Sequence, residues 1–151
     1  MGRLEAIWLK TARGGPMARQ ERATAIENVG LDGCAGGGHK WRQVTVIEKE
    51  VFDRLKADLP DSDPAMRRAN VMVSGIRLEE CRDKILQIGG MRLHMRAETL
   101  PCNLMEEQCP GLQAALAPDW NAGAFGKVLN DAEIAVGDTV AWVDAGEVAA
   151  D

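Results

Sequence analysis

The chain has 151 residues, of which 46% are hydrophobic and 27% are charged, the balance of a soluble globular domain rather than of a disordered chain. Its 18 basic and 23 acidic side chains give a formal net charge of −5, which argues against nucleic acid as the main partner. No stretch approaches the roughly 18 apolar residues that span a bilayer, and the N-terminus has no signal-peptide pattern. We therefore expect a single cytoplasmic domain over residues 1–144, without a membrane partner, and a flexible acidic tail over residues 145–151.

Short β-branched or alternating segments predict most of the secondary structure. Strands are expected over residues 4–9, 43–48, 70–76, 85–88, 91–97, 125–129 and 139–143, the last two as a pair. Gly89 and Gly90 form a hairpin-type dipeptide. In the strand that follows them, apolar residues alternate with Arg92, His94 and Arg96, which predicts one apolar and one basic face.

Helices are expected to be few and short. Val51, Leu55 and Leu59 have helical spacing and predict a helix over residues 50–59. Residues 103–116, which Pro110-Gly111 interrupts, predict one broken helix or two short ones. Residues 18–28 are interpreted as a short helix or an ordered loop. This pattern predicts a mainly β fold, a barrel or sandwich with a few short helices.

The four cysteines are expected to be free thiols, because a chain of this length can bury a sufficient core without disulfides. Cys102 follows Pro101 and precedes a segment that can begin a helix, where unpaired N–H groups favour a thiolate. A thiolate can attack an electrophile, carry a sulfane sulfur or bind a soft metal. Inert packing of a buried thiol is the alternative for Cys102.

Zinc binding is the other interpretation of the cysteines. Cys34, His39, Cys102 and Cys109 would be the ligands, but the paired Cys-x-x-Cys spacing of structural zinc sites is missing. Cys102 and Cys109 would stand nearly two turns apart on a helix, too far for a disulfide without rearrangement. Cys81 and Cys109 are therefore interpreted as bystanders.

Two further segments contain candidate binding residues. Arg68 and Asn70 precede a strand and suit a phosphate or a pterin-like heterocycle, although from spacing alone a solvated arginine and a turn-forming asparagine explain them better. The glycine-rich segment over residues 30–39 suits either a loop that closes over a ligand or a flexible surface loop. His94 is more typical of a surface histidine than of a ligand.

Several of these segments together resemble the MOSC domain, named for the C-terminal domain of molybdenum cofactor sulfurase. In order and spacing they resemble the small stand-alone bacterial members, from the first strand to Trp142. The segments are Gly30-Leu31-Asp32-Gly33, Arg42-Gln43-Val44-Thr45, Arg68-Ala69-Asn70-Val71-Met72-Val73-Ser74-Gly75-Ile76, Gly89-Gly90, Glu98-Thr99-Leu100-Pro101-Cys102, Pro110-Gly111-Leu112, Phe125-Gly126-Lys127-Val128-Leu129 and Val136-Gly137-Asp138.

The resemblance implies a barrel of the MOSC/pyruvate-kinase type that binds the molybdenum cofactor (molybdopterin). It implies that Cys102 ligates molybdenum, that Arg68 and Asn70 hold the cofactor's phosphate and pterin, and that Lys10 and Thr11 also contact it. Many relatives have Gly-Asp where this chain has Gly33-Cys34, so a cofactor-facing group is lost there or supplied by His39 or Lys40.

Three functions follow from the resemblance as alternatives. The first is an oxidoreductase that reduces N-hydroxylated substrates and receives electrons from a separate redox protein, since no flavin, haem or iron–sulfur motif is visible in the chain. The second is a sulfur carrier, in which Cys102 holds a persulfide from a sulfur donor protein and delivers it to a metal centre or a biosynthetic partner. The third is a degenerate, non-catalytic MOSC domain.

Overall fold

The computed structural model describes residues 2–12, 16–35, 38–101 and 103–143, which include eleven strands, three α-helices and one 3₁₀ helix. The strands are β1 (Gly2–Lys10), β2 (Met17–Gln20), β3 (Arg22–Ile26), β4 (Gly30–Leu31), β5 (Val44–Glu48), β6 (Val71–Ser74), β7 (Ile85–Ile88), β8 (Met91–Glu98), β9 (Ala124–Val128), β10 (Ala132–Ala135) and β11 (Thr139–Val143). The helices are α1 (Lys49–Asp58), the 3₁₀ helix η1 (Pro64–Arg67), α2 (Asn103–Gln108) and α3 (Leu112–Leu116).

Seven strands form a closed barrel, which confirms the mainly β, barrel-like fold. Their order is β11-β7-β8-β9-β5-β6-β1, and β1 pairs with β11 to close the ring, with Gly2 opposite Val140. Within the ring only β5 and β6 are parallel, and α1 and η1 connect them. Strand β2 pairs with β1 outside the ring, and β10, β3 and β4 form a separate small sheet.

The barrel interior is filled by the apolar faces of its strands. On β8, Met91, Leu93 and Met95 are fully buried, whereas the intervening basic residues are half-buried on the outer face. This confirms the predicted apolar and basic faces of that strand. Strand β5 is instead buried along its whole length, because one face meets the barrel core and the other meets the helices.

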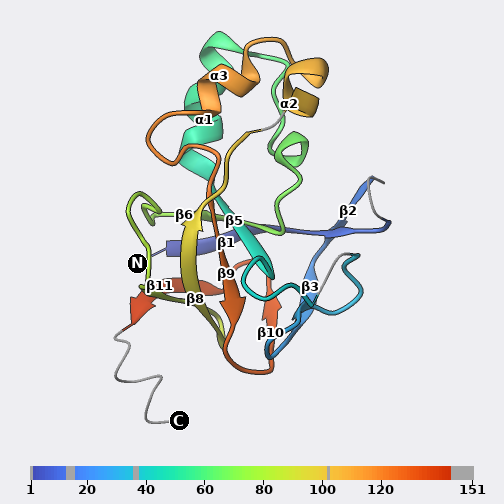
Figure 1. The fold of residues 1–151 in the computed structure, drawn as a ribbon, viewed down its shortest axis with the longest axis vertical. Helices are drawn as coiled ribbons and strands as arrows, with labels where there is room; N and C mark the ends of the chain where they lie inside the picture. Colours follow the sequence, from blue (N-terminus) through green and yellow to red (C-terminus); the bar gives the residue numbers. More distant parts are fainter. Residues whose placement is uncertain (1, 13–15, 36–37, 102, 144–151) are drawn as a thin grey trace.

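The helices gather at one end of the barrel, where they enclose a second apolar core (Figure 1). Ile47 of β5 and Phe52 of α1 pack there with Met105, Leu112 and Leu116 of the two later helices. The predicted helix over residues 50–59 is confirmed as α1, and Pro110 and Gly111 divide the later segment into α2 and α3. In the described part of the chain, no helix is long and apolar enough to cross a membrane.

Two predictions about the strands were wrong. Residues 18–28, interpreted as a helix or an ordered loop, contain most of β2 and all of β3. The buried residues of β3 are Ala23 and Ala25, whose small side chains give a weak apolar alternation. The segments 125–129 and 139–143 are strands but do not pair: β9 lies between β8 and β5, while β11 lies between β7 and β1.

Candidate functional site

The half-buried thiol of Cys34 marks the meeting point of three segments that are distant in the sequence. Its Sγ accepts hydrogen bonds from the backbone N–H of Lys10, at 3.4 Å, and from Nδ2 of Asn70, also at 3.4 Å. The next residue, Ala35, donates its N–H to the Lys10 carbonyl at 2.8 Å. The loop after β4 is therefore fastened to the end of β1 and to the start of β6.

Asn70 fixes this arrangement from inside the barrel wall. The residue is only 6% exposed, and its Oδ1 accepts the backbone N–H of Thr45 at 2.9 Å. Its own N–H donates to the Thr45 carbonyl at 3.0 Å, and its carbonyl accepts the N–H of Trp8 at 2.7 Å. Asn70 thus links β1, β5 and the loop after β4 that contains Cys34. The barrel strands position the Asn70 side chain, and this side chain in turn positions the Cys34 thiol.

Several charged side chains act on Lys10, in a chain whose formal net charge is −5. Burial lowers the pKa of the Lys10 amine, the nearby Cys34 sulfur opposes that shift, and the guanidinium groups of Arg42, Arg68 and Arg67 reinforce it. Three guanidinium groups therefore act on the Lys10 amine, and positive charge of this kind favours an anionic ligand.

Arg68 and the basic face of β8 belong to different parts of the barrel, because β9 and β5 separate β8 from β6. Lys10, Arg42 and Arg67 accompany Arg68 instead.

The two arginines at the end of η1 have different surroundings. Arg67 is buried and donates from Nε to the carbonyl of Ala122 at 2.8 Å, which anchors η1 to the segment before β9. Arg68 adopts the left-handed conformation, with φ of 60°, which ends η1. At the other end of η1, Asp63 caps the helix by accepting the N–H of Ala65 at 2.8 Å.

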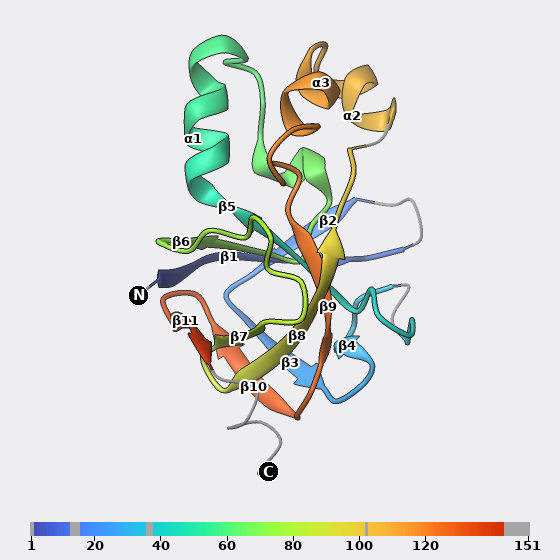
Figure 2. The same ribbon diagram turned by 60° about the vertical axis from the view of Figure 1, so that its left-hand side comes forward.

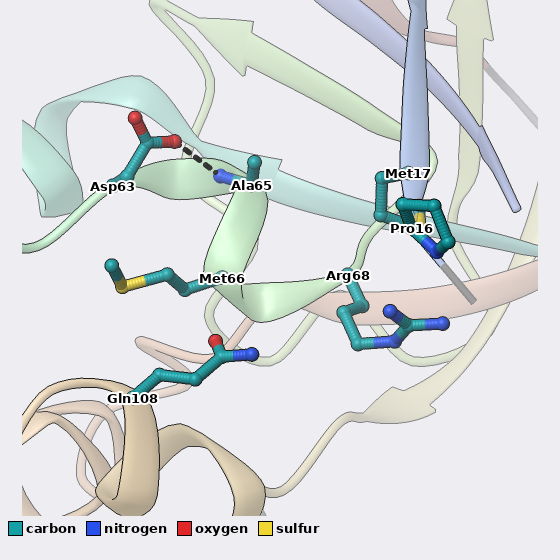
Figure 3. Close-up of a pocket in the computed structure, with 7 residues that line it drawn as sticks. All are labelled: Pro16, Met17, Asp63, Ala65, Met66, Arg68 and Gln108. Carbon is teal, nitrogen blue, oxygen red and sulfur yellow. Dashed lines mark hydrogen bonds between the residues drawn. The ribbon is translucent and has the colours of Figure 1, made fainter. Parts of the chain in front are cut away.

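Arg68 lines a cleft of about 600 Å³ between the β1–β2 hairpin, η1 and α2. The lining residues are Pro16, Met17, Asp63, Ala65, Met66, Arg68 and Gln108. Figure 3 shows the Arg68 side chain extending below Pro16, and Gln108 of α2 pointing towards η1. The volume is in the range of small-molecule sites, and Met17 and Met66 supply apolar surface to its lining.

The other residues expected at a site have varied positions. Thr11 is exposed, and its hydroxyl donates to the Pro16 carbonyl at 2.8 Å, so it supports the β1–β2 turn. His39 is exposed, and its carbonyl accepts Nε2 of Gln43 at 2.7 Å. The metal-ligand prediction falls on Cys102, which lies outside the described residues. Cys81 and Cys109 are buried in the two cores, and burial raises the pKa of the Cys81 thiol to about 11.

Sequence reasoning missed several members of the site. It treated Cys34 as a departure from the resemblance and gave no role to Met17, Met66 or Gln108. The glycines around Cys34 indicated a loop but not its contact with Asn70, 36 residues away. In the described part of the chain, no three His, Cys, Asp or Glu side chains cluster closely enough to hold a metal ion.

The fold and the site define a small closed-barrel protein with a cleft at its helical end that Arg68 lines. A family model of the MOSC domain matches residues 35–141, and the chain belongs to the MOSC domain family. A search of curated proteins found no significant match.

Solved structures share the fold at low sequence identity. The YuaD protein of Bacillus subtilis superposes with a TM-score of 0.74 at 19% identity, covering 93% of this chain and 94% of that one. YiiM of Geobacillus stearothermophilus superposes with a TM-score of 0.73 at 15% identity, and the match covers 97% of this chain and 77% of that one. YiiM of Escherichia coli superposes with a TM-score of 0.69 at 13% identity, and the match covers 94% of this chain and 70% of that one.

Proposed function

We propose that this protein binds the molybdenum cofactor in the cleft beside Arg68 and catalyses the reduction of N-hydroxylated compounds, with Cys102 as the protein ligand to the metal. The observation that carries the proposal is a cleft of about 600 Å³ that Arg68 lines, together with the electrostatic influence of Arg68 and Arg42 on Lys10. Membership of the MOSC domain family supports it, because that family is associated with this cofactor.

The chemistry of the residues present fits the cofactor. A guanidinium such as that of Arg68 presents planar donors that match a phosphate, and Lys10 adds a second positive charge. Met17 and Met66 offer polarizable apolar surface to a flat heterocycle. Asn70 holds the neighbouring backbone in place through its bonds to Thr45 and Cys34. When bound, the molybdenum centre would supply the two-electron redox chemistry.

The proposed reaction balances with an external electron donor. An N-hydroxylated compound R–NHOH gains two electrons and two protons, its N–O bond breaks, and R–NH₂ and water leave. The donor is a separate redox protein, which is oxidised by two electrons. The chain's own contribution is to bind the anionic cofactor and to orient the substrate in the cleft.

Metal analysis of protein from a cofactor-competent host tests this proposal. Wild type should carry close to one molybdenum per chain, and Cys102→Ser and Arg68→Ala should each carry much less. Arg54→Ala, on the exposed surface of α1, is the matched arginine control and should load like wild type. Substoichiometric molybdenum in both wild type and Cys102→Ser would rule the proposal out. Loaded wild type should also reduce an N-hydroxylated purine when a chemical reductant is supplied.

A sulfur-carrier function is the second candidate, and the position of Cys34 favours it. In that function a Cys102 thiolate attacks the outer sulfur of a donor persulfide, the donor thiolate leaves, and Cys102 retains the sulfur. Cys34 supplies a further thiol, whose sulfur accepts hydrogen bonds from the Lys10 N–H and from Asn70. Intact mass spectrometry after incubation with a cysteine desulfurase tests it. No labile gain of one sulfur atom, in wild type or in Cys34→Ser, would exclude this function.

A further inference from the structure

The outer faces of β8 and β9 carry aromatic and basic side chains that the proposed site does not use. His94 of β8 lies opposite Lys127 of β9, and the register shifts before Phe125 comes opposite Ala97. The flanking residues of β9 are buried, so Phe125 and Lys127 lie half-buried on the outer side. The two strands lie side by side along one wall of the barrel (Figure 2).

Trp41, from the loop before β5, joins these strands through contacts between cations and rings. The Trp41 ring centroid lies 4.7 Å from Cζ of Arg96 and 4.5 Å from Nζ of Lys127, and the His94 ring meets it edge-on at 5.2 Å. These contacts hold two flexible basic side chains at fixed places. Cζ of the exposed Arg42 lies 5.7 Å from the centroid of the Phe125 ring. We call this surface the Trp41 face; its residues are Trp41, Arg42, His94, Arg96, Phe125 and Lys127.

Buried hydrogen bonds position the loop that supplies Trp41 and Arg42. Gln43 is 6% exposed, and its Nε2 donates to the His39 carbonyl at 2.7 Å and to Oδ1 of Asn28 at 3.1 Å. Its Oε1 accepts the N–H of Val128 at 2.9 Å. The Trp41 face is therefore formed by the fold itself and needs no ligand to arrange it.

The Trp41 face is positively charged although the chain as a whole is negative. His94 is paired with Asp83, whose Oδ1 lies 3.0 Å from Nε2 of the imidazole. Among the described residues, no carboxylate lies within salt-bridge distance of Arg42, Arg96 or Lys127. Their charges thus remain available to a partner, in a chain of formal net charge −5.

The Trp41 face is continuous with the candidate site. Phe125 lies opposite Thr45 of β5, and the N–H of Thr45 is bound by Asn70. Arg42 contributes both to this face and to the electropositive surroundings of Lys10. A protein bound on the Trp41 face would consequently contact Arg42, which also acts electrostatically on Lys10.

We propose that the Trp41 face is the docking surface for an acidic electron-carrier protein. Protein interfaces are enriched in tryptophan, phenylalanine and arginine, and complementary charge steers the encounter of the partners. This inference rests on the proposed function for what the carrier delivers, namely the two electrons of the reduction. The docking itself depends only on the surface and is measurable without cofactor.

The binding experiment uses two acidic electron carriers, a small ferredoxin and a flavodoxin, titrated into the full chain by calorimetry. We expect binding that weakens steeply as sodium chloride rises from about 50 to about 300 mM, because salt screens exposed charges. Arg96→Glu with Lys127→Glu should weaken binding by about tenfold or more. Arg42→Glu, on an exposed side chain, is a second variant that should weaken binding without disturbing the strands.

Arg54→Glu with Lys56→Glu is the matched control, since it makes the same charge change on the exposed surface of α1. It should bind the carriers like wild type, and thermal unfolding should show that all variants are folded. Absence of binding by both carriers overturns the proposal, as does an equal loss in the control. Tighter binding of a single-stranded DNA oligonucleotide that depends on the same residues also overturns it, since the face would then be a nucleic-acid site.

A kinetic arm separates failure of this inference from failure of the proposed function. Cofactor-loaded Arg96→Glu/Lys127→Glu should keep its rate with a small chemical reductant and lose about tenfold or more in kcat/KM with the protein carrier. No reduction with either donor would refute the proposed function, while the binding data still decide the docking surface. Equal rates of the variant and wild type with the protein carrier would refute the docking surface alone.

Discussion

Replacement of Asn70 by alanine should destabilise the protein measurably. The side chain is 6% exposed, and its Oδ1 accepts the Thr45 N–H at 2.9 Å within the barrel wall. Alanine offers no acceptor, so that N–H would remain buried and unpaired, at a cost of about 1–3 kcal/mol. In a chain of this length about 1 kcal/mol lowers Tm by roughly 2–4 °C, so we expect Tm to fall by about 2–12 °C.

Urea unfolding of Asn70→Ala and of a matched control measures this cost. In the control, Asn130→Ala, the lost hydrogen bonds are those from the Arg92 N–H to Oδ1 and from Nδ2 to the Gly90 carbonyl, at a partly exposed turn. Water can replace these bonds, so the control should lose less than about 1 kcal/mol. Equal losses for the two variants, within about 0.5 kcal/mol, would refute the structural role of Asn70.

Asn70→Asp separates the stability effect from the effect on the thiol. The aspartate keeps an acceptor for Thr45 but replaces the Nδ2 donor to the Cys34 sulfur with a carboxylate oxygen. A negative charge beside the sulfur disfavours the thiolate, so iodoacetamide should alkylate Cys34 more slowly than in wild type. Peptide mass spectrometry over a time course reads this rate. Unchanged alkylation would show that Asn70 does not act on the thiol.

Three further predictions follow from burial and backbone packing. Near about pH 8, iodoacetamide should label Cys34 well before Cys81, whose pKa burial raises to about 11; faster labelling of Cys81 in the native protein would contradict this. Gly126→Ala should destabilise by about 2 kcal/mol or more, because its Cβ would overlap a carbonyl oxygen of β8, whereas Gly90→Ala meets only ordinary contacts and should change little in urea unfolding. Burial raises the pKa of Glu48, so the contribution of this carboxyl to stability is present below its unfolded pKa and is lost as pH rises through its folded pKa. Glu48→Gln should therefore have a higher Tm than wild type near about pH 7 and lose that advantage near about pH 4. The opposite trend in Tm would refute the raised pKa of Glu48.

The strands that sequence reasoning found are those whose side chains are large. Val44–Glu48 is a β-branched run, which has a high propensity for strands. Met91, Leu93 and Met95 alternate with basic residues, so the two-residue hydrophobic period also predicts a strand there. Strand β3 buries only alanines between exposed polar residues, so the same period gives a weak signal. Which strands pair with each other was harder to predict than which segments are strands. The neighbours of β9 and β11 are set by closure of the whole barrel rather than by the nearest turn.

The candidate site depended on the same long-range information. Arg68 and Asn70 stood out because a short local motif contains both residues. The contact of Asn70 with Cys34, and the electrostatic influence of Arg42 on Lys10, join segments that no local pattern connects. Only the order of the barrel strands brings those segments together.

The cysteine at position 34 also affects the balance of charge around Lys10. Many relatives in the resemblance have an aspartate after the corresponding glycine, and a carboxylate there would offset one of the neighbouring cations. A thiol accepts the same hydrogen bonds, from Lys10 and Asn70, without a permanent charge. The positive charge of Lys10, Arg42 and Arg68 is therefore less compensated from within the protein. Under the proposed function, a thiol at this position therefore leaves more positive charge near Lys10 for an anionic ligand.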